Sequence, residues 1–259
     1  MRILHATLAL FCLLGCAVSA AERPLVDFGR WDSAGLERII AEARRLETPG
    51  ERIVSPSRNF LATPYVADTL IGDPQTAEQL VITLAGFDCF TFLDVIEALR
   101  RAADLDDFPE QLKQVRYRGG KVSYENRRHF FSDWVADDTA RVGDMTAAVG
   151  QGRARAVVKQ LNLKSDGSRW LPGLPVTRRE IVYIPADEMD RDVLSALQAG
   201  DYVGIYSDHA GLDVSHVGLL VQGKDRFMLR HASLSNGVVD VDLLEYLQGK
   251  PGLVVYRAR

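Results

Sequence analysis

Three side chains far apart in the sequence have the types needed for nucleophilic catalysis at a carbonyl carbon: Cys89, His216 and His231. A cysteine thiolate is a strong nucleophile, and a histidine within hydrogen-bonding reach can take the thiol proton. A third group then holds that histidine in the required tautomer. These residue types predict a thiol hydrolase in which one imidazole contacts Cys89 while the other orients the first.

Cys89 comes directly after a residue that should begin a helix. An extended segment, residues 79–85, leads through Gly86-Phe87-Asp88 into apolar residues with helical spacing. Asp88 is a natural N-cap, because its side-chain oxygen can accept hydrogen bonds from the free amides of the first turn. Those amides and the helix dipole stabilise an anion, so the pKa of Cys89 is expected to lie below its ordinary value of about 8.5. The same amides could also bind the oxyanion of an attacked carbonyl.

The two histidines are expected on neighbouring strands of one hairpin. Residues 214–222 and 226–231 alternate as strands, and a two-residue loop at Gly223-Lys224 would place His216 directly opposite His231 on one face. Gly218, on that same face, would leave room for the Cys89 helix to approach. A loop one residue longer would shift the pairing and stagger the two rings.

Residues 1–20 have the pattern of a secretory signal peptide. Arg2 precedes an apolar run that is short for a transmembrane helix, and small residues predict cleavage after Ala20. Alternatively, a lipoprotein-like processing box would attach lipid to Cys16, the only way in which stable membrane attachment is expected. Either route exports the chain from the cytoplasm.

Export changes how the cysteines are interpreted. The chain has three, Cys12, Cys16 and Cys89, and only Cys89 remains after cleavage at Ala20. Thiols in an oxidising compartment are usually paired or absent. A lone thiol there is better explained by reactivity than by packing as a small buried apolar side chain.

The rest of the chain, residues 21–259, is expected to form a single catalytic domain with helices first and strands later. Helices are predicted at residues 33–46, from Cys89 onward, and within 144–161, with a short hairpin over 115–124. Strands are predicted at residues 181–184, 202–207, 214–222, 226–231 and 253–257, with short helices at 190–198 and 241–247. The expected class is therefore α+β, with an antiparallel sheet packed on helices and the nucleophile at a helix N-terminus.

Composition limits the partners. The formal net charge of −4 gives no electrostatic reason to expect nucleic-acid binding. No cofactor and no metal site are predicted.

Several segments resemble the NlpC/P60 superfamily of papain-like cell-wall hydrolases, and more narrowly the DUF1460 family of N-acetylmuramoyl-L-alanine amidase-like proteins. These segments are Thr63-Pro64-Tyr65, Phe87-Asp88-Cys89-Phe90-Thr91-Phe92, Arg127-Arg128-His129-Phe130-Phe131-Ser132-Asp133-Trp134, Val214-Ser215-His216-Val217-Gly218 and Arg230-His231-Ala232-Ser233. The resemblance implies a papain-like fold, with Cys89 as nucleophile, His216 as base and His231 as the third polar residue.

The resemblance also implies the substrate and the compartment. The bond expected to be cut is the amide between an N-acetylmuramoyl group, preferably the 1,6-anhydro form, and L-alanine of the stem peptide. Such substrates are soluble peptidoglycan fragments, so the bacterial periplasm is the expected location.

Other residues could contact the substrate. Tyr65 could donate to the oxyanion or border the groove, whereas Arg127 and Asp133 could recognise the substrate or form a local ion pair that holds Trp134. His129 is expected in a structural cluster, and His209 is either exposed or lines the cleft. The substrate-binding candidates are Tyr65, Asp88, Arg127, Asp133, Trp134 and Ser215.

Three alternative functions remain open at this point. The same three residues could serve an endopeptidase that cuts after γ-D-glutamate. They could instead bind zinc, since three protein ligands and a water make a catalytic zinc site, although the sequence has no H-E-x-x-H segment. A third alternative is an inactive module that only binds muropeptides.

Overall fold

The computed structural model describes residues 24–137 and 141–259. The predicted signal peptide, with Cys12 and Cys16, lies outside the described residues, so its cleavage and lipidation stay predictions. No helix in the described part of the chain is long and apolar enough to cross a bilayer.

The N-terminal half is mainly helical, as expected. Its two short strands pair in parallel, and two 3-10 turns follow the fourth helix. In chain order the elements are β1 (Leu25–Asp27), α1 (Ser33–Arg44), α2 (Pro49–Arg58), β2 (Val81–Thr83), α3 (Cys89–Arg101), α4 (Phe108–Arg116), η1 (Arg118–Gly120), η2 (Tyr124–Asn126) and α5 (Asp133–Asp137).

The C-terminal half forms a large antiparallel sheet. Its strand order is β4-β5-β10-β6-β7-β8-β9, and β3 also pairs with β10. The strands are β3 (Val142–Asp144), β4 (Arg155–Leu161), β5 (Thr177–Pro185), β6 (Tyr202–Tyr206), β7 (Val214–Gln222), β8 (Phe227–Ser233), β9 (Gly237–Asp242) and β10 (Gly252–Ala258). Between them lie α6 (Thr146–Gly150), η3 (Ala186–Glu188), α7 (Arg191–Ala196) and α8 (Leu243–Leu247). The structure thus confirms a mixed α and β fold with an antiparallel sheet packed on helices.

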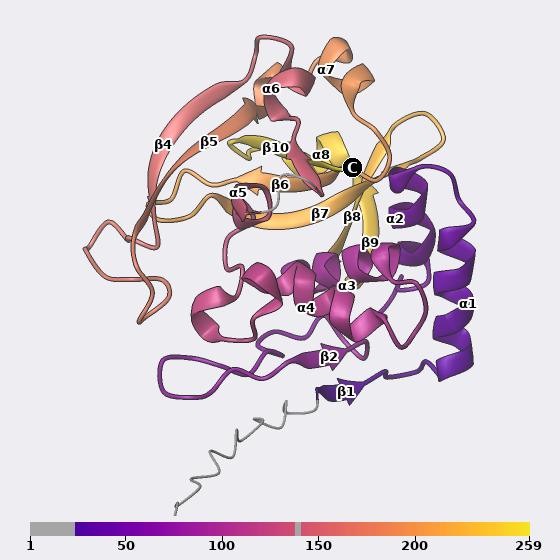
Figure 1. Cartoon of the computed structure of the whole chain (residues 1–259). Coiled ribbons are helices and arrows are strands. Elements are labelled where there is room, and N and C mark those ends of the chain that lie inside the picture. Colours follow the sequence, from indigo (N-terminus) through magenta and orange to yellow (C-terminus); the bar gives the residue numbers. More distant parts are fainter. Residues whose placement is uncertain (1–23, 138–140) are drawn as a thin grey trace, which may run out of the picture.

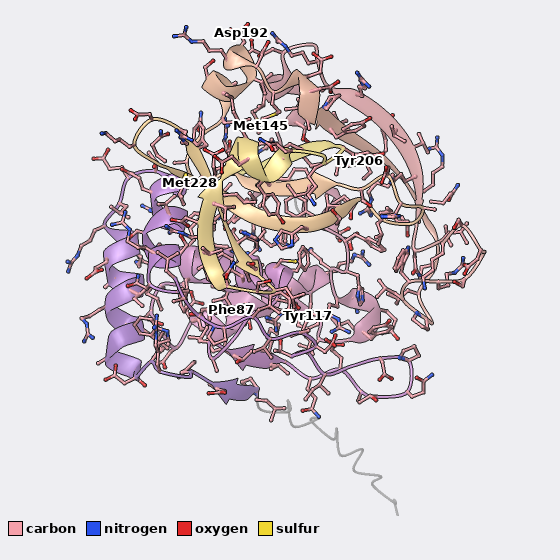
Figure 2. The ribbon with its side chains drawn as sticks, turned by 180° about the vertical axis from the view of Figure 1, so that it is seen from behind. Phe87, Tyr117, Met145, Asp192, Tyr206 and Met228 are labelled. Carbon is pink, nitrogen blue, oxygen red and sulfur yellow. The ribbon has the colours of Figure 1, made fainter. Side chains whose placement is uncertain are left out.

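Two apolar cores cover the two faces of the sheet. Figure 1 shows α3 and α4 on one side of the sheet and α6, α7 and α8 on the other. In β7, Val217 and Leu219 belong to the first core, which contains α3, whereas Leu220 belongs to the second core with residues of α8. In Figure 2, seen from behind, Phe87 lies on the side of the first core and Met145 on the side of the second. Successive side chains of a strand point to opposite faces of the sheet, so each one packs against the helices on its own face.

Several predicted elements differ from the observed ones. Residues 115–124 do not form a hairpin, because α4 continues to Arg116 and is followed by η1, in which Gly119 and Gly120 take positive φ values of 58° and 65°. The glycines do turn the chain, but no paired strands flank them. The helix expected within 144–161 ends at Gly150, since residues 155–161 instead pair with β5 as strand β4. Strand β9 was not predicted, and it precedes the shorter helix α8.

Candidate active site

Cys89 is the first residue of α3, where the sequence predicted it. The Asp88 Oδ1 atom accepts hydrogen bonds from the amides of Phe90 (2.9 Å) and Thr91 (2.7 Å). In return, Thr91 Oγ1 accepts a hydrogen bond from the Asp88 amide at 3.0 Å, which completes a capping box. These bonds fix the start of the helix and so fix the position of the thiol.

The surroundings of Cys89 do not make it an easily ionised thiol. The amides of Val217, Cys89 and Phe90 lie within hydrogen-bonding reach of the sulfur and favour the thiolate. Burial has the larger and opposite effect, and the negative charge of Asp88 adds to it, so the pKa of Cys89 is raised to about 11. The expectation of a lowered pKa was therefore wrong, and the resting group is a neutral thiol. Burial could not be deduced from the helix start alone.

The two histidines contact each other directly. The Nε2 atom of His216 lies 2.6 Å from Nδ1 of His231, with the rings 4.8 Å apart and nearly perpendicular. Burial lowers the pKa of His216 to about 4, and the positive charges of His231 and Lys250 act in the same direction. Burial also lowers the pKa of His231 to about 4, against the opposing charge of Asp240. Both imidazoles are therefore neutral at neutral pH, and the short contact is a single hydrogen bond between them.

The pairing of β7 with β8 differs from the predicted register. Leu219 pairs with Arg230 and Gln222 with Phe227, so four residues, 223–226, form the turn. The Gly223 amide closes this turn by donating to the Arg226 carbonyl at 2.8 Å. His231 is consequently offset from His216 by two residues, and the prediction of directly opposed histidines was wrong. An even offset keeps both side chains on one face, which is why the rings still meet.

The expected role of Gly218 is also corrected. A Cβ atom at Gly218 would lie 2.6 Å from Leu229 Cδ1 and 3.1 Å from His231 Cβ. The glycine thus makes room for β8. Helix α3 packs on the opposite face of β7, the face of Val217 and Leu219.

Tyr246 completes the cluster and was not among the residues predicted from the sequence. Its ring lies 5.0 Å from that of His231 and 5.9 Å from that of His216, between centroids. Burial raises the pKa of Tyr246, and the negative charge that Cys89 carries as a thiolate acts in the same direction. A helix was expected over residues 241–247, but nothing marked this tyrosine among the eight in the chain.

Tyr65 lies beside the segment that leads into α3. Its backbone bridges to Phe87, directly before Asp88, and its side chain is half-buried against the first core. Burial raises the pKa of Tyr65, and the negative charges of the Cys89 thiolate and of Asp88 act in the same direction. The structure therefore brings Tyr65, Asp88 and Cys89 together.

Arg127 and Asp133 do not form the ion pair considered as one alternative. Arg127 Nη2 donates to the Gly72 carbonyl at 2.8 Å and lies 3.4 Å from a Glu78 carboxylate oxygen. Asp133 instead pairs with Arg179 at 2.6 Å and with Arg118 at 3.1 Å. Each residue therefore holds a different part of the chain.

Trp134 and Ser215 have contrasting positions. Trp134 is 4% exposed and packs edge-on against Tyr202, with ring centroids 5.1 Å apart. This burial favours a role in packing over contact with a substrate. Ser215 is exposed, and its hydroxyl donates to the Ile205 carbonyl at 3.4 Å.

The other two histidines in the described part of the chain belong to local structure. A ring nitrogen of His129 lies 2.7 Å from the Tyr124 carbonyl oxygen, and burial lowers the pKa of His129 to about 4. The His209 carbonyl accepts a hydrogen bond from buried Lys159 Nζ at 3.0 Å. Within residues 24–137 and 141–259, no group of three or more His, Cys, Asp or Glu side chains has the geometry to hold a metal ion.

A pocket of about 350 Å³ adjoins the start of α3. Asp88 and Phe90, the neighbours of Cys89 in the chain, form part of its wall. Arg127 and His129 line it as well, whereas Trp134 does not.

A comparison with known families identifies the kind of protein. Residues 55–253 match the AmiA-like family, described as N-acetylmuramoyl-L-alanine amidase-like. The match spans most of the chain and includes Cys89, His216 and His231, so the chain belongs to this amidase-like family. This membership makes it a hydrolase of the amidase type with a function related to peptidoglycan. No curated protein matches the chain.

Solved structures support the same family and fold. An N-acetylmuramoyl-L-alanine amidase from Bacteroides uniformis shares 26% sequence identity at a TM-score of 0.70, over 82% of this chain and 99% of that one. Protein LPG0564 of Legionella pneumophila, a DUF1460 protein, has a TM-score of 0.72 at 23% identity, over 87% of this chain and 94% of that one. This similarity supports the fold alone. A Bacteroides fragilis protein provisionally called a xylanase shares 28% identity at a TM-score of 0.65, over 78% and 98%.

Proposed function

We propose that this protein is an exported cysteine amidase that hydrolyses the amide between N-acetylmuramic acid, in its 1,6-anhydro form, and L-alanine of peptidoglycan fragments. The observation that carries the proposal is the contact of 2.6 Å between His216 Nε2 and His231 Nδ1. The Cys89 sulfur lies close to this pair of histidines, because it is within hydrogen-bonding reach of the Val217 amide. Val217 directly follows His216 in β7. The family membership supports the class of substrate, and the resemblance to NlpC/P60 hydrolases supports the use of a thiol.

The histidine pair determines which atoms act. Because Nε2 of His216 faces His231, Nδ1 of His216 is the atom left to accept the thiol proton. For that, Nε2 must carry its hydrogen and donate it to His231 Nδ1, so that His231 carries its own hydrogen on Nε2. His231 then stabilises the imidazolium that forms on His216.

The reaction follows from a neutral thiol and a neutral imidazole. The Cys89 proton passes to His216 as the sulfur attacks the lactyl carbonyl, and the Cys89 amide binds the oxyanion, because Asp88 already accepts from the Phe90 and Thr91 amides. Collapse of this intermediate breaks the C–N bond, and His216 returns the proton to the amine of alanine. Water, deprotonated by His216, then cleaves the thioester and releases the muramoyl acid and the free thiol.

The test is digestion of purified 1,6-anhydro-muropeptides followed by mass spectrometry. The wild-type protein is expected to release sugar and intact peptide, and Cys89→Ala to be inactive with an unchanged circular-dichroism spectrum. Hydrolysis retained by Cys89→Ala would exclude the thiol mechanism, whereas a split peptide would identify a γ-D-glutamyl endopeptidase. Inhibition by a chelator but not by iodoacetamide would point to a zinc amidase. Binding of muropeptides without turnover would point to an inactive binding module.

The proposed location, the bacterial periplasm, depends on residues 1–20. Mass spectrometry of the mature protein is expected to find Ala21 at its N-terminus. A lipid-modified Cys16 at that terminus would instead show a membrane-attached lipoprotein. An uncleaved chain retained in the cytoplasm would contradict export.

A further inference from the structure

The pocket beside α3 is built from segments that only the fold brings together. Its wall includes residues 68–73, the start of α3, residues 124–129 and Leu171 in the connection between β4 and β5. The Tyr124 hydroxyl donates to the Pro172 carbonyl at 3.2 Å and ties two of these segments together. Arg127 ties in a third through its bond to the Gly72 carbonyl.

Three residues that line this pocket carry buried polar atoms without a hydrogen-bond partner. These atoms are Thr69 Oγ1, Asp94 Oδ1 and Arg127 Nε. An unpaired buried polar atom costs about 1–3 kcal/mol, so three around one pocket form a costly arrangement. The cost is understandable if a polar ligand supplies the missing partners.

Contacts of the neighbouring atoms fix the orientation of the Asp94 carboxylate and of the Arg127 guanidinium. Asp94 Oδ2 accepts from Arg116 Nε at 2.9 Å, which holds the carboxylate and leaves only its other oxygen unpaired. The Arg127 guanidinium lies over the Tyr124 ring at 5.2 Å, and its Nη2 atom already faces the Gly72 carbonyl and a Glu78 carboxylate oxygen, so Nε is a donor left for a ligand. A preorganised guanidinium binds a carboxylate with little loss of conformational entropy.

We propose that this pocket binds the peptide part of the substrate, with the free carboxylate of the residue after L-alanine held by Arg127 and the polar hydrogens of the peptide accepted by Thr69 and Asp94. This inference rests on the proposed function. The pocket is also lined by Asp68, Asp73 and Asp88, so the choice of occupant rests on Arg127 Nε. The peptide part of the substrate carries a carboxylate that can meet this donor, whereas the uncharged sugar does not. The sugar then lies on the other side of Cys89, toward the rings of Tyr65 and Tyr246, because the scissile amide must sit at the sulfur.

The test uses two substrates that differ in one charge: 1,6-anhydro-N-acetylmuramoyl-L-alanyl-D-glutamate and its D-isoglutamine counterpart. The wild-type protein is expected to favour the glutamate substrate about tenfold in kcat/KM, mainly through KM, since a charge-assisted hydrogen bond is at stake. Arg127→Gln is expected to remove this preference. Equal use of both substrates by the wild-type protein would overturn the inference while leaving the amidase function intact.

Thr69→Val gives a second readout that does not depend on Arg127. Since the hydroxyl has no partner in the free protein, its removal is expected to leave the melting temperature unchanged or higher and to raise KM severalfold. Trp31→Phe is the matched control, because Trp31 Nε1 is also buried and unpaired but does not line the pocket. A KM unchanged by Thr69→Val, or raised equally by Trp31→Phe, would contradict the role of the pocket.

If neither substrate is cleaved, binding separates the two proposals. Calorimetry with Cys89→Ala and the peptide L-alanyl-D-glutamate is expected to show binding that Arg127→Gln abolishes. Binding without cleavage by the wild-type protein would sink the proposed function alone. Failure of the peptide to bind would sink the pocket proposal.

Discussion

At the residue scale, the surroundings of Cys89, the proposed nucleophile, favour its protonated form. The pKa of Cys89 is raised to about 11 and that of His216 is lowered to about 4, so the thiolate–imidazolium pair is the unfavourable state at neutral pH. In the proposed reaction the proton therefore moves during the attack on the carbonyl. A neutral thiol is also less readily oxidised than a thiolate, which is consistent with the proposed export of the chain.

The pH dependence of the rate follows from this state. His216 must be neutral to accept the proton, and it stays neutral down to a pH of about 4. The value of kcat/KM is therefore expected to hold between pH 6.5 and 5 and to fall only near pH 4. A pH–rate profile measures this, and an acidic limb centred near pH 6.5 would contradict it.

At the scale of single elements, Asp88 has two separable effects on α3. It caps the helix through two amides, and its charge raises the pKa of Cys89. Asp88→Asn keeps a good cap but removes the charge. We expect this variant to alkylate faster with iodoacetamide at a given pH, because the pKa of its thiol is lower.

Asp88→Ala is the matched variant that also removes the cap. Its free energy of unfolding is expected to fall by about 1 kcal/mol relative to Asp88→Asn, measured by urea denaturation. Equal alkylation rates in wild type and Asp88→Asn would show that the charge does not reach the sulfur. Equal stability of the two variants would show that the cap contributes nothing.

The sequence predicted those parts of the site that depend on local pattern. The start of α3 was predictable because Asp88 and the apolar spacing lie within a few residues. The shared face of His216 and His231 was predictable because side chains alternate along strands. The exact register was not, since it depends on whether the turn after Gln222 closes after two residues or four.

Features that depend on depth or on distant segments could not be predicted. The pKa of Cys89 follows from burial under β7, which no local pattern reveals. Tyr246 reaches the histidines only because β9, absent from the predicted elements, sets the position of α8. The pocket beside α3 needs five separate segments, so of its residues only those in motifs, such as Arg127, were noticed.

At the scale of the whole molecule, buried neutral histidines couple stability to pH. The pKa values of His129, His216 and His231 are all lowered to about 4 by burial. In the unfolded chain the same groups take up protons below about pH 6.5. The unfolded state then binds more protons, so the stability contributed by these histidines is complete above pH 6.5 and is lost as the pH falls toward 4.

Buried carboxyl groups such as Asp94 and Asp213 have pKa values raised by burial, so their contribution to stability changes with pH in the opposite direction. A double variant separates the contribution of the histidines from theirs. The stability difference between wild type and His216→Asn/His231→Asn is expected to shift against the wild type from pH 6.5 to pH 4. Urea denaturation at several pH values measures it. A difference that does not vary with pH would show that the two imidazoles are not held neutral.

The four-residue turn between β7 and β8 has a consequence for how the gene can change. Loss of one codon there would make the pairing slip by one residue and turn His231 toward the face of Val217, away from His216. Loss of two codons would instead produce the two-residue turn and leave both imidazoles on their present face. Insertions and deletions in this hairpin are therefore expected to be inherited in pairs of codons.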